Sequence, residues 1–194
     1  FLAVGLLVLA YWWLNPNPPK TVTLATGPAQ SAYEEFGKRY QKALAVDGID
    51  VVLLPSEGSS HNLQLLRDGQ ADVAFVQGGT AELQPDDPDN LVSLGSLFVE
   101  PLWLFYRTDA AERMHNAPRL DSLRQLRGWR VNVGSEGSGV PTLIERLLQA
   151  NKVEPGSVKL SRLEQTPATL EFHAGRLDAL VFASAPESLM VQML

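Results

Sequence analysis

The sequence predicts an α/β protein in two lobes, each a mostly parallel sheet flanked by helices. Two observations predict this fold class. First, strand-like and helix-like segments alternate along residues 21–194 with short turns between them, and this alternation is typical of parallel sheets. Second, the pattern occurs twice, each time with a strand, a Gly/Ser-rich turn and a helix near its beginning. We expect lobe one at residues 21–106 and lobe two at residues 107–194.

The predicted strands of lobe one are short and apolar, and they lie at residues 21–26, 49–54 and 71–76. The last is almost wholly apolar, as a strand covered on both faces is. Ser31 is a good cap for a helix whose apolar residues recur every three or four positions. A second helix follows the turn at residues 58–60, and Gly69 ends it.

Around the expected boundary of the lobes, polar and apolar stretches alternate. Residues 81–90 are polar with two prolines and predict a loop. Residues 91–106 are mainly apolar and are broken by Glu100-Pro101, so they predict two strands. Residues 109–118 are polar again.

Lobe two repeats the alternation of strands and helices. Its predicted strands lie at residues 129–133, 157–163 and 177–183. Its predicted helices lie at residues 121–126, from the turn at 134–139 to Ala150, at 166–174, and from Pro186 onward.

The composition excludes several classes of protein. The chain has 194 residues, a formal net charge of −6 and no cysteine. An acidic balance argues against nucleic-acid binding, which usually needs a basic face. The absence of cysteine excludes disulfides, thiolate metal sites and cysteine nucleophiles. The three histidines are too far apart for metal-ligand spacing, so we expect no metal and no cofactor.

Residues 1–14 are uncharged and mostly apolar. A membrane-spanning helix needs about 20 such residues, and Tyr11, Trp12 and Trp13 suit the aromatic belt at a membrane surface. We predict a truncated transmembrane anchor here, with a Pro-rich linker at residues 15–20. A cleaved signal peptide and a buried core helix are the alternatives. Neither end of the chain carries a terminal signal, so we expect a piece of a longer protein.

Three strand-to-helix turns are the candidate binding elements. They lie at residues 27–31, 56–60 and 134–139 and are rich in glycine and serine. Each precedes a helix whose first N–H groups and positive dipole end favour an anion. In parallel sheets such turns share the carboxyl edge, where ligands bind. The alternative is that each turn only caps its helix.

The sequence matches none of the nucleotide-binding and catalytic motifs that it partly resembles. Residues 137–142 resemble the start of a dinucleotide fingerprint, but Thr142 replaces its third glycine. No Gly-Lys-Ser/Thr triplet and no nucleophile elbow occurs. Ser59 and His61 are two residues apart at a helix start and therefore point in different directions.

Three stretches resemble the TAXI family of solute receptors, which serve TRAP transporters. They are Gly58-Ser-Ser-x-Asn-Leu (58–63), Gly69-x-Ala-Asp-Val-Ala (69–74) with Gln77, and Gly134-x-x-Gly-Ser-Gly (134–139). The resemblance covers residues 21–194 and implies the type II periplasmic-binding-protein fold. It also implies a small organic acid or amino acid ligand such as glutamate or glutamine, and transporter membrane subunits as partners. Val140 stands where the family pattern continues with threonine, which removes one hydroxyl donor.

The candidate ligand-binding residues lie in the three turns and after the third strand: Ser31, Tyr33, Ser59, Ser60, Asn62, Gln77, Ser135, Ser138 and Gly139. Hydroxyls and helix N–H groups would hold a carboxylate, and the two amides would hold an amide or amine. Tyr33 suits either the ligand or the core. We expect closure about a hinge near Arg107.

The leading hypothesis is a receptor anchored in the inner membrane and facing the periplasm. A sensor, in which the same ligand-binding unit drives a signalling module, is the second hypothesis. An enzyme on this scaffold is the third, although the sequence offers no nucleophile, base or metal in workable geometry.

Overall fold

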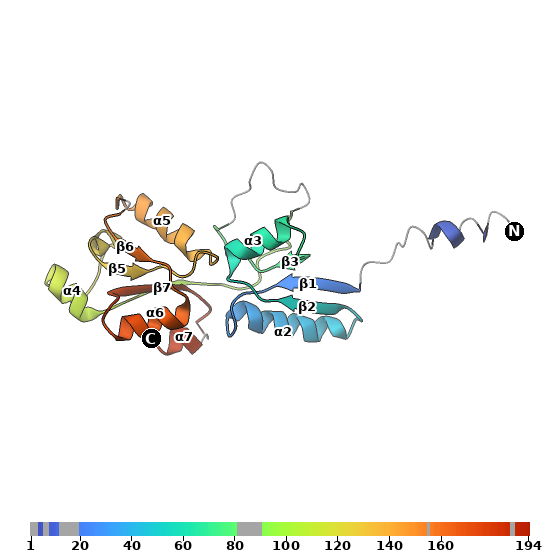
Figure 1. Cartoon of the computed structure of the whole chain (residues 1–194), viewed down its shortest axis with the longest axis horizontal. Helices are drawn as coiled ribbons and strands as arrows, with labels where there is room; N and C mark the ends of the chain where they lie inside the picture. The colour runs from blue at the N-terminus through green and yellow to red at the C-terminus, as the bar shows by residue number, and fades with distance from the viewer. Residues whose placement is uncertain (1–3, 6–7, 12–19, 81–90, 155, 187–188) are drawn as a thin grey trace.

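The computed structural model describes residues 4–5, 8–11, 20–80, 91–154, 156–186 and 189–194. Figure 1 shows two lobes side by side, each with a sheet between helices. The predicted α/β architecture of two lobes is therefore present. The predicted loop at residues 81–90 and most of the predicted anchor and linker lie outside the described residues.

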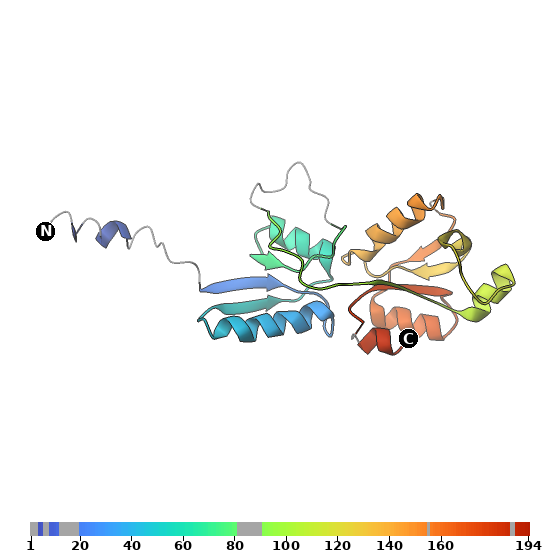
Figure 2. The same cartoon turned by 180° about the vertical axis from the view of Figure 1, so that it is seen from behind.

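Lobe one has a fully parallel sheet with strand order β2-β1-β3. Its elements in chain order are β1 (Thr21–Ala25), α2 (Ala32–Ala45), β2 (Asp50–Leu54), α3 (Ser59–Arg67) and β3 (Val73–Ala74). Helices α2 and α3 lie on opposite faces of the sheet (Figures 1 and 2). Leu24 packs toward Tyr33 of α2, and the next residue along β1, Ala25, packs toward Leu65 of α3. The two-residue period of a strand thus supplies both half-cores.

Lobe two has a four-stranded sheet with order β4-β7-β5-β6. Its strands are β4 (Leu102–Tyr106), β5 (Arg130–Asn132), β6 (Lys159–Ser161) and β7 (Ala179–Ala183). Its helices are α4 (Thr108–His115), the 3₁₀ helix η1 (Leu123–Leu126), α5 (Val140–Ala150), α6 (Gln165–His173) and α7 (Leu189–Gln192).

Strand β7 is the centre of lobe two and is buried along almost its whole length. Ala179 and Val181 pack with α5, whereas Leu180 and Phe182 pack toward α6. Its continuous apolar run is what a strand covered on both faces requires. Strand β4 runs antiparallel to β7, and the other pairs are parallel.

Three sequence expectations are corrected. Residues 91–101 form no strand; the sheet of lobe one ends at β3, so this segment has no ladder partner, and Leu94 is 82% exposed. Strand β4 belongs to lobe two, so the lobe boundary lies before Leu102 and not after residue 106. The polar residues after Arg107 form helix α4, whose buried Ala110 and Ala111 fill its inner face.

The prediction of a membrane anchor stays a prediction. Within the described ranges, which include only residues 4–5 and 8–11 of that segment, no helix has both the length and the apolar character needed to cross a bilayer.

Candidate functional site

A cleft of about 440 Å³ lies between the two lobes. Lobe one lines it with residues 28–33, 56–59 and Gln77, and the crossing segment contributes Glu100. Lobe two lines it with residues 134–135, 138–140, 164–166 and 181–184. The cleft therefore stands at the carboxyl ends of β1, β2, β5 and β7, where ligands bind in parallel α/β sheets.

Turn one supplies the cleft wall in front of α2. The Ser31 Oγ accepts a hydrogen bond from the Glu34 N–H at 3.3 Å and so caps the helix. The Glu34 carboxylate in turn accepts from the Gln30 N–H at 2.6 Å. The Ser31 side chain is therefore a helix cap that also lines the cleft, and its contact with a ligand stays a prediction.

A chain of hydrogen bonds links the buried polar groups of lobe one. The Gln77 N–H donates to Ser59 Oγ at 2.9 Å, and the Tyr33 hydroxyl donates to Glu100 Oε2 at 2.8 Å. Ser59 Oγ and Tyr33 Oη lie 3.3 Å apart. Because the Tyr33 proton points to Glu100, the Ser59 hydroxyl donates to Tyr33. Every donor in the chain therefore points toward the Glu100 carboxylate.

The surroundings of Tyr33 and Glu100, at the end of this series of hydrogen bonds, shift the pKa values of both side chains. Burial raises the pKa of Tyr33 far above its ordinary value, and the charge of Glu100 raises it further, so the phenol stays protonated. Burial also raises the pKa of Glu100, against the hydrogen bond from Tyr33, which lowers it. Glu100 has no ion-pair partner among the described residues, and its second oxygen, Oε1, has no hydrogen-bond donor there.

Turn two joins the lobes. The backbone N–H groups of Ser60 and His61, in the first turn of α3, both donate to the carbonyl oxygen of Gly137, at 3.0 and 3.1 Å. A Cβ on Gly137 would overlap the Glu57 side chain. The closeness of the two lobes therefore depends on a residue without a side chain at that position. In this arrangement the two N–H groups face a protein carbonyl and not a ligand carboxylate.

Turn three and the residue after β3 each bring one polar side chain to the cleft that has no protein partner among the described residues. Ser138 Oγ donates to the Ser135 carbonyl at 2.7 Å, so it is engaged within the turn. Among the described residues, the Ser135 hydroxyl and the Gln77 side-chain amide have no hydrogen-bond partner. Both residues line the cleft, and they are the groups most available to a solute.

Two predicted site residues lie away from the cleft wall. Asn62 is fully buried, and its amide donates to the carbonyl oxygens of Thr26 and Phe75, so it joins the ends of β1 and β3. Ser60 also does not line the cleft. The other seven predicted residues, from Ser31 to Gly139, line it.

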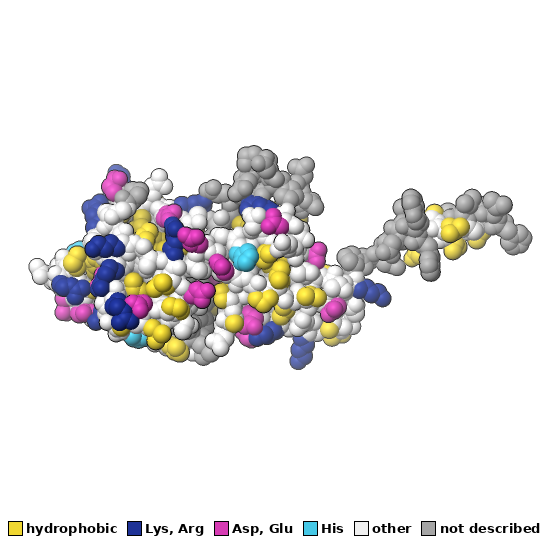
Figure 3. Space-filling model, viewed as in Figure 1, with side chains coloured by type: hydrophobic (Ala, Val, Ile, Leu, Met, Phe, Trp, Pro, Cys, Tyr) yellow, Lys and Arg dark blue, Asp and Glu magenta, His cyan; other side chains and the backbone are white. Residues whose placement is uncertain are grey.

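Sequence reasoning missed the acidic residues of the cleft. Glu57, Glu100 and Glu164 all line it, and on the face in Figure 3 acidic side chains lie along the boundary between the lobes. The signal that could have found Glu100 is a single charge inside the long apolar stretch at residues 91–106. Such a charge is rarely buried without a role.

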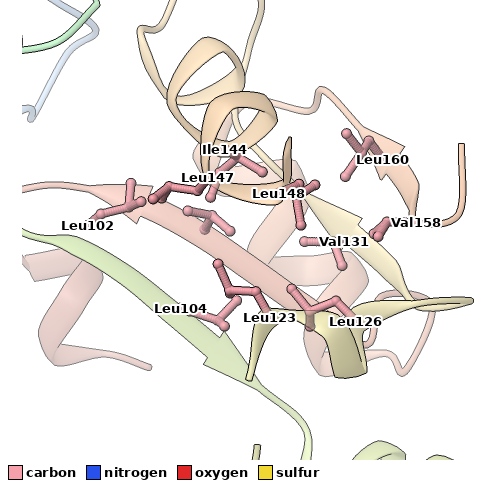
Figure 4. Close-up of a pocket in the computed structure, with 11 residues that line it drawn as sticks. Leu102, Leu104, Leu123, Leu126, Val131, Ile144, Leu147, Leu148, Val158 and Leu160 are labelled. Atoms are coloured by element: carbon pink, nitrogen blue, oxygen red, sulfur yellow. The ribbon is translucent and has the colours of Figure 1, made fainter. Parts of the chain in front are cut away.

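A second cavity, of about 200 Å³, lies inside lobe two (Figure 4). Eleven aliphatic side chains line it, and Leu104, Ile144 and Leu148 among them point into it from β4 and α5. It has no charged lining residue and belongs to the hydrophobic core of that lobe. Within the described ranges, no three His, Asp or Glu side chains gather as a metal site would need.

Three solved structures with a similar fold are ligand-binding proteins or domains. The alkanesulfonate-binding protein SsuA from Xanthomonas axonopodis pv. citri, bound to MOPS, aligns with a TM-score of 0.54 and 15% identity over 87% of this chain and 56% of that chain. An ancestral arginine-binding protein bound to glutamine aligns with a TM-score of 0.55 and 14% identity over 86% of this chain and 70% of that chain. The effector-binding domain of QuiR in complex with shikimate aligns with a TM-score of 0.59 and 14% identity over 89% of this chain and 76% of that chain.

These identities establish the fold alone, which confirms the predicted periplasmic-binding-protein-like α/β architecture. The chain spans little more than half the length of SsuA. The family comparison reaches further, because the NMT1-like family matches residues 24–194. This chain belongs to the NMT1-like family.

Proposed function

We propose that this chain is the ligand-binding part of an extracytoplasmic solute receptor that encloses a small solute between its two lobes. The observation that carries the proposal is the cleft of about 440 Å³, which is lined from both lobes. Its volume is within the usual range for small-molecule sites, about 300–1,000 Å³. The free Ser135 hydroxyl and Gln77 amide supply the few convergent polar groups that such sites use for orientation.

Closure follows from the contacts between the lobes. The N–H groups of Ser60 and His61 reach the Gly137 carbonyl only when the lobes are together. Arg146 of lobe two also donates to the Gly79 carbonyl of lobe one at 2.7 Å. A solute that contacts both walls would favour this closed arrangement over an open one, since it binds the closed form better.

The finer proposal is a receptor of the TAXI type, held at the inner membrane by residues 1–14, facing the periplasm and serving TRAP membrane subunits. Its support is the three motifs at residues 58–63, 69–77 and 134–139 and the uncharged run at residues 1–14. A glutamate-like or glutamine-like solute goes with that proposal. No catalytic role is proposed for any residue of the cleft.

A ligand-binding sensor is the second candidate. It is favoured by the fold likeness to the QuiR effector-binding domain, which has a higher TM-score than SsuA. In a sensor the same cleft would take the ligand, and closure would act on a signalling module.

The test is thermal unfolding of the full-length protein against amino acids, dicarboxylates and keto acids. A ligand at 100 times its Kd stabilises the folded state by about 2.7 kcal/mol, which raises the Tm by about 2–4 °C per kcal/mol in a chain of this size. Ser135→Ala should reduce the shift, and Ser93→Ala, at an exposed position outside the cleft, should leave it unchanged. A folded protein whose Tm no compound raises would contradict the proposal.

A further inference from the structure

The charged side chains of the cleft are all acidic. Glu57, Glu100 and Glu164 line it, and no Lys, Arg or His is among the described lining residues. Arg162, two residues before Glu164, does not line the cleft and pairs instead with Glu136 and Glu145, at 2.8 and 3.0 Å. Among the described residues, a solute in the cleft therefore meets acidic side chains and no basic one.

Glu100 is the innermost of these acids by its contacts. Its Oε2 accepts from the buried Tyr33 hydroxyl, and its Oε1 has no donor among the described residues. The chain from Gln77 through Ser59 and Tyr33 directs each proton toward this carboxylate. A buried carboxylate is normally paired with a cation, because an unpaired charge is costly to remove from water. Burial indeed raises the pKa of Glu100.

The opposite wall has a different character. Turn three presents the Ser135 hydroxyl to the cleft and leads into α5 at its N-cap Gly139, where the positive end of the helix dipole favours a carboxylate. The Gln77 amide lies at the same junction, with its Oε1 3.2 Å from where a Cβ on Gly139 would stand. Glu164 also lines the lobe-two wall, but turn three itself suits the carboxylate of a small zwitterion, and Glu100 on the opposite side suits its cationic end.

We propose that the solute of this cleft carries a protonated amine and that Glu100 is the residue that binds this amine. The inference rests on the proposed function and narrows its solute class. An ammonium group has three donors, of which one fills the open Oε1 of Glu100. A solute with carboxylates or a sulfonate and no cationic nitrogen would bring negative charge to Glu100 with nothing to offset it.

The experiment is isothermal titration of the full-length protein with two matched pairs of compounds. L-glutamine is compared with glutaramate, and L-leucine with 4-methylpentanoate; within each pair only the amine differs. At least one amine-bearing compound should bind ten times or more as tightly as its partner, which corresponds to about 1.4 kcal/mol. Glu100→Gln keeps the acceptor for Tyr33 and removes the charge, so it should abolish that preference. Glu112→Gln, an exposed position on α4, should preserve it.

The outcomes separate the inference from the proposed function. Equal or tighter binding of glutaramate or 4-methylpentanoate by the native protein would overturn the inference and leave the receptor proposal standing. Retention of the full amine preference in Glu100→Gln, with the fold checked by circular dichroism, would remove Glu100 from the role. Failure of all four compounds to bind a folded protein would count against both proposals.

Discussion

Two carboxylates lie partly buried in this molecule, and their surroundings differ. Asp178, before β7 in lobe two, accepts from Arg130 at 2.7 Å and from Arg113 at 3.2 Å. Glu100, at the cleft, has a tyrosine hydroxyl and no cation among the described residues. Burial raises the pKa of both, but in Asp178 the hydrogen bonds and charge of Arg130, with the charge of Arg113, prevail and lower it.

The hydrogen-bond partners of the two carboxylates distinguish a structural acid from a candidate functional one. Asp178 also accepts from the backbone N–H of Arg130, so it ties β5 to β7 and is satisfied within the lobe. Glu100 lines the cleft, and its Oε1 has no hydrogen-bond donor among the described residues. A buried charge that the protein leaves unpaired at a cavity is a candidate for contact with a ligand.

The largest expected effect contrasts the two acids in stability. Asp178→Asn should lower the free energy of unfolding by about 1.5–3 kcal/mol, because hydrogen bonds to charged groups are lost. Glu100→Gln should leave the ligand-free protein equally stable or more stable, since it removes a partly buried charge that has no cation among the described residues. Urea unfolding at pH 7 measures both values. A greater loss in Glu100→Gln than in Asp178→Asn would reverse the comparison.

A second prediction concerns the closed arrangement in which Glu100 meets the solute. A Cβ on Gly139 would overlap the Thr80 side chain of lobe one. Gly139→Ala should therefore weaken solute binding about tenfold, since overpacking costs about 1–3 kcal/mol. The matched control is Gly78→Ala, where a Cβ meets no atom within 4 Å. Equal affinities in the two variants, by calorimetry, would show that closure does not use this contact.

The smallest expected effect is on the pH dependence of stability. The lowered pKa of Asp178 stabilises the fold above the unfolded value of about 3.9, and this stabilisation is lost as the pH falls through the folded pKa. The raised pKa of Glu100 has the opposite sign: its contribution is fully present below about pH 4.3 and is lost as the pH rises through the folded pKa.

Urea unfolding of the native protein and both variants from pH 3 to pH 7 separates these contributions. The deficit of Asp178→Asn should shrink toward pH 3. The stability of Glu100→Gln relative to the native protein should rise from pH 4 to pH 7, and a fall over that range would contradict the raised pKa of Glu100.

The sequence predicted the features that depend on neighbouring residues, namely the helices, the strands and the cap at Ser31. Alternating strands and helices predicted most elements, and the parallel-sheet rule predicted that the turns at residues 27–31 and 134–139 each lie at the carboxyl edge of their own sheet, where both line the cleft. The cap at Ser31 was likewise readable, because the serine and the two following glutamates form a local signal.

Long-range contacts decided the rest. Glu100 meets Tyr33 across 67 positions, and the Gly137 carbonyl meets the start of α3 across the lobes. Asn62 has the residue type of a ligand contact, yet it is fully buried and its amide nitrogen donates to two strand-end carbonyls. The apolar residues 91–101 have strand composition, but a strand also needs a neighbour for its backbone groups.

The most direct test of the central claim is an ¹⁵N chemical-shift titration of the full-length protein with the compound that raises its Tm most. If the solute binds in the cleft, the amide signals of Gln77, Glu100 and Ser135 should shift together and saturate at one affinity, while those of Arg130 and Asp178 should move little. Shifts confined to residues around the apolar cavity of lobe two, with the cleft signals unchanged, would contradict binding in the cleft.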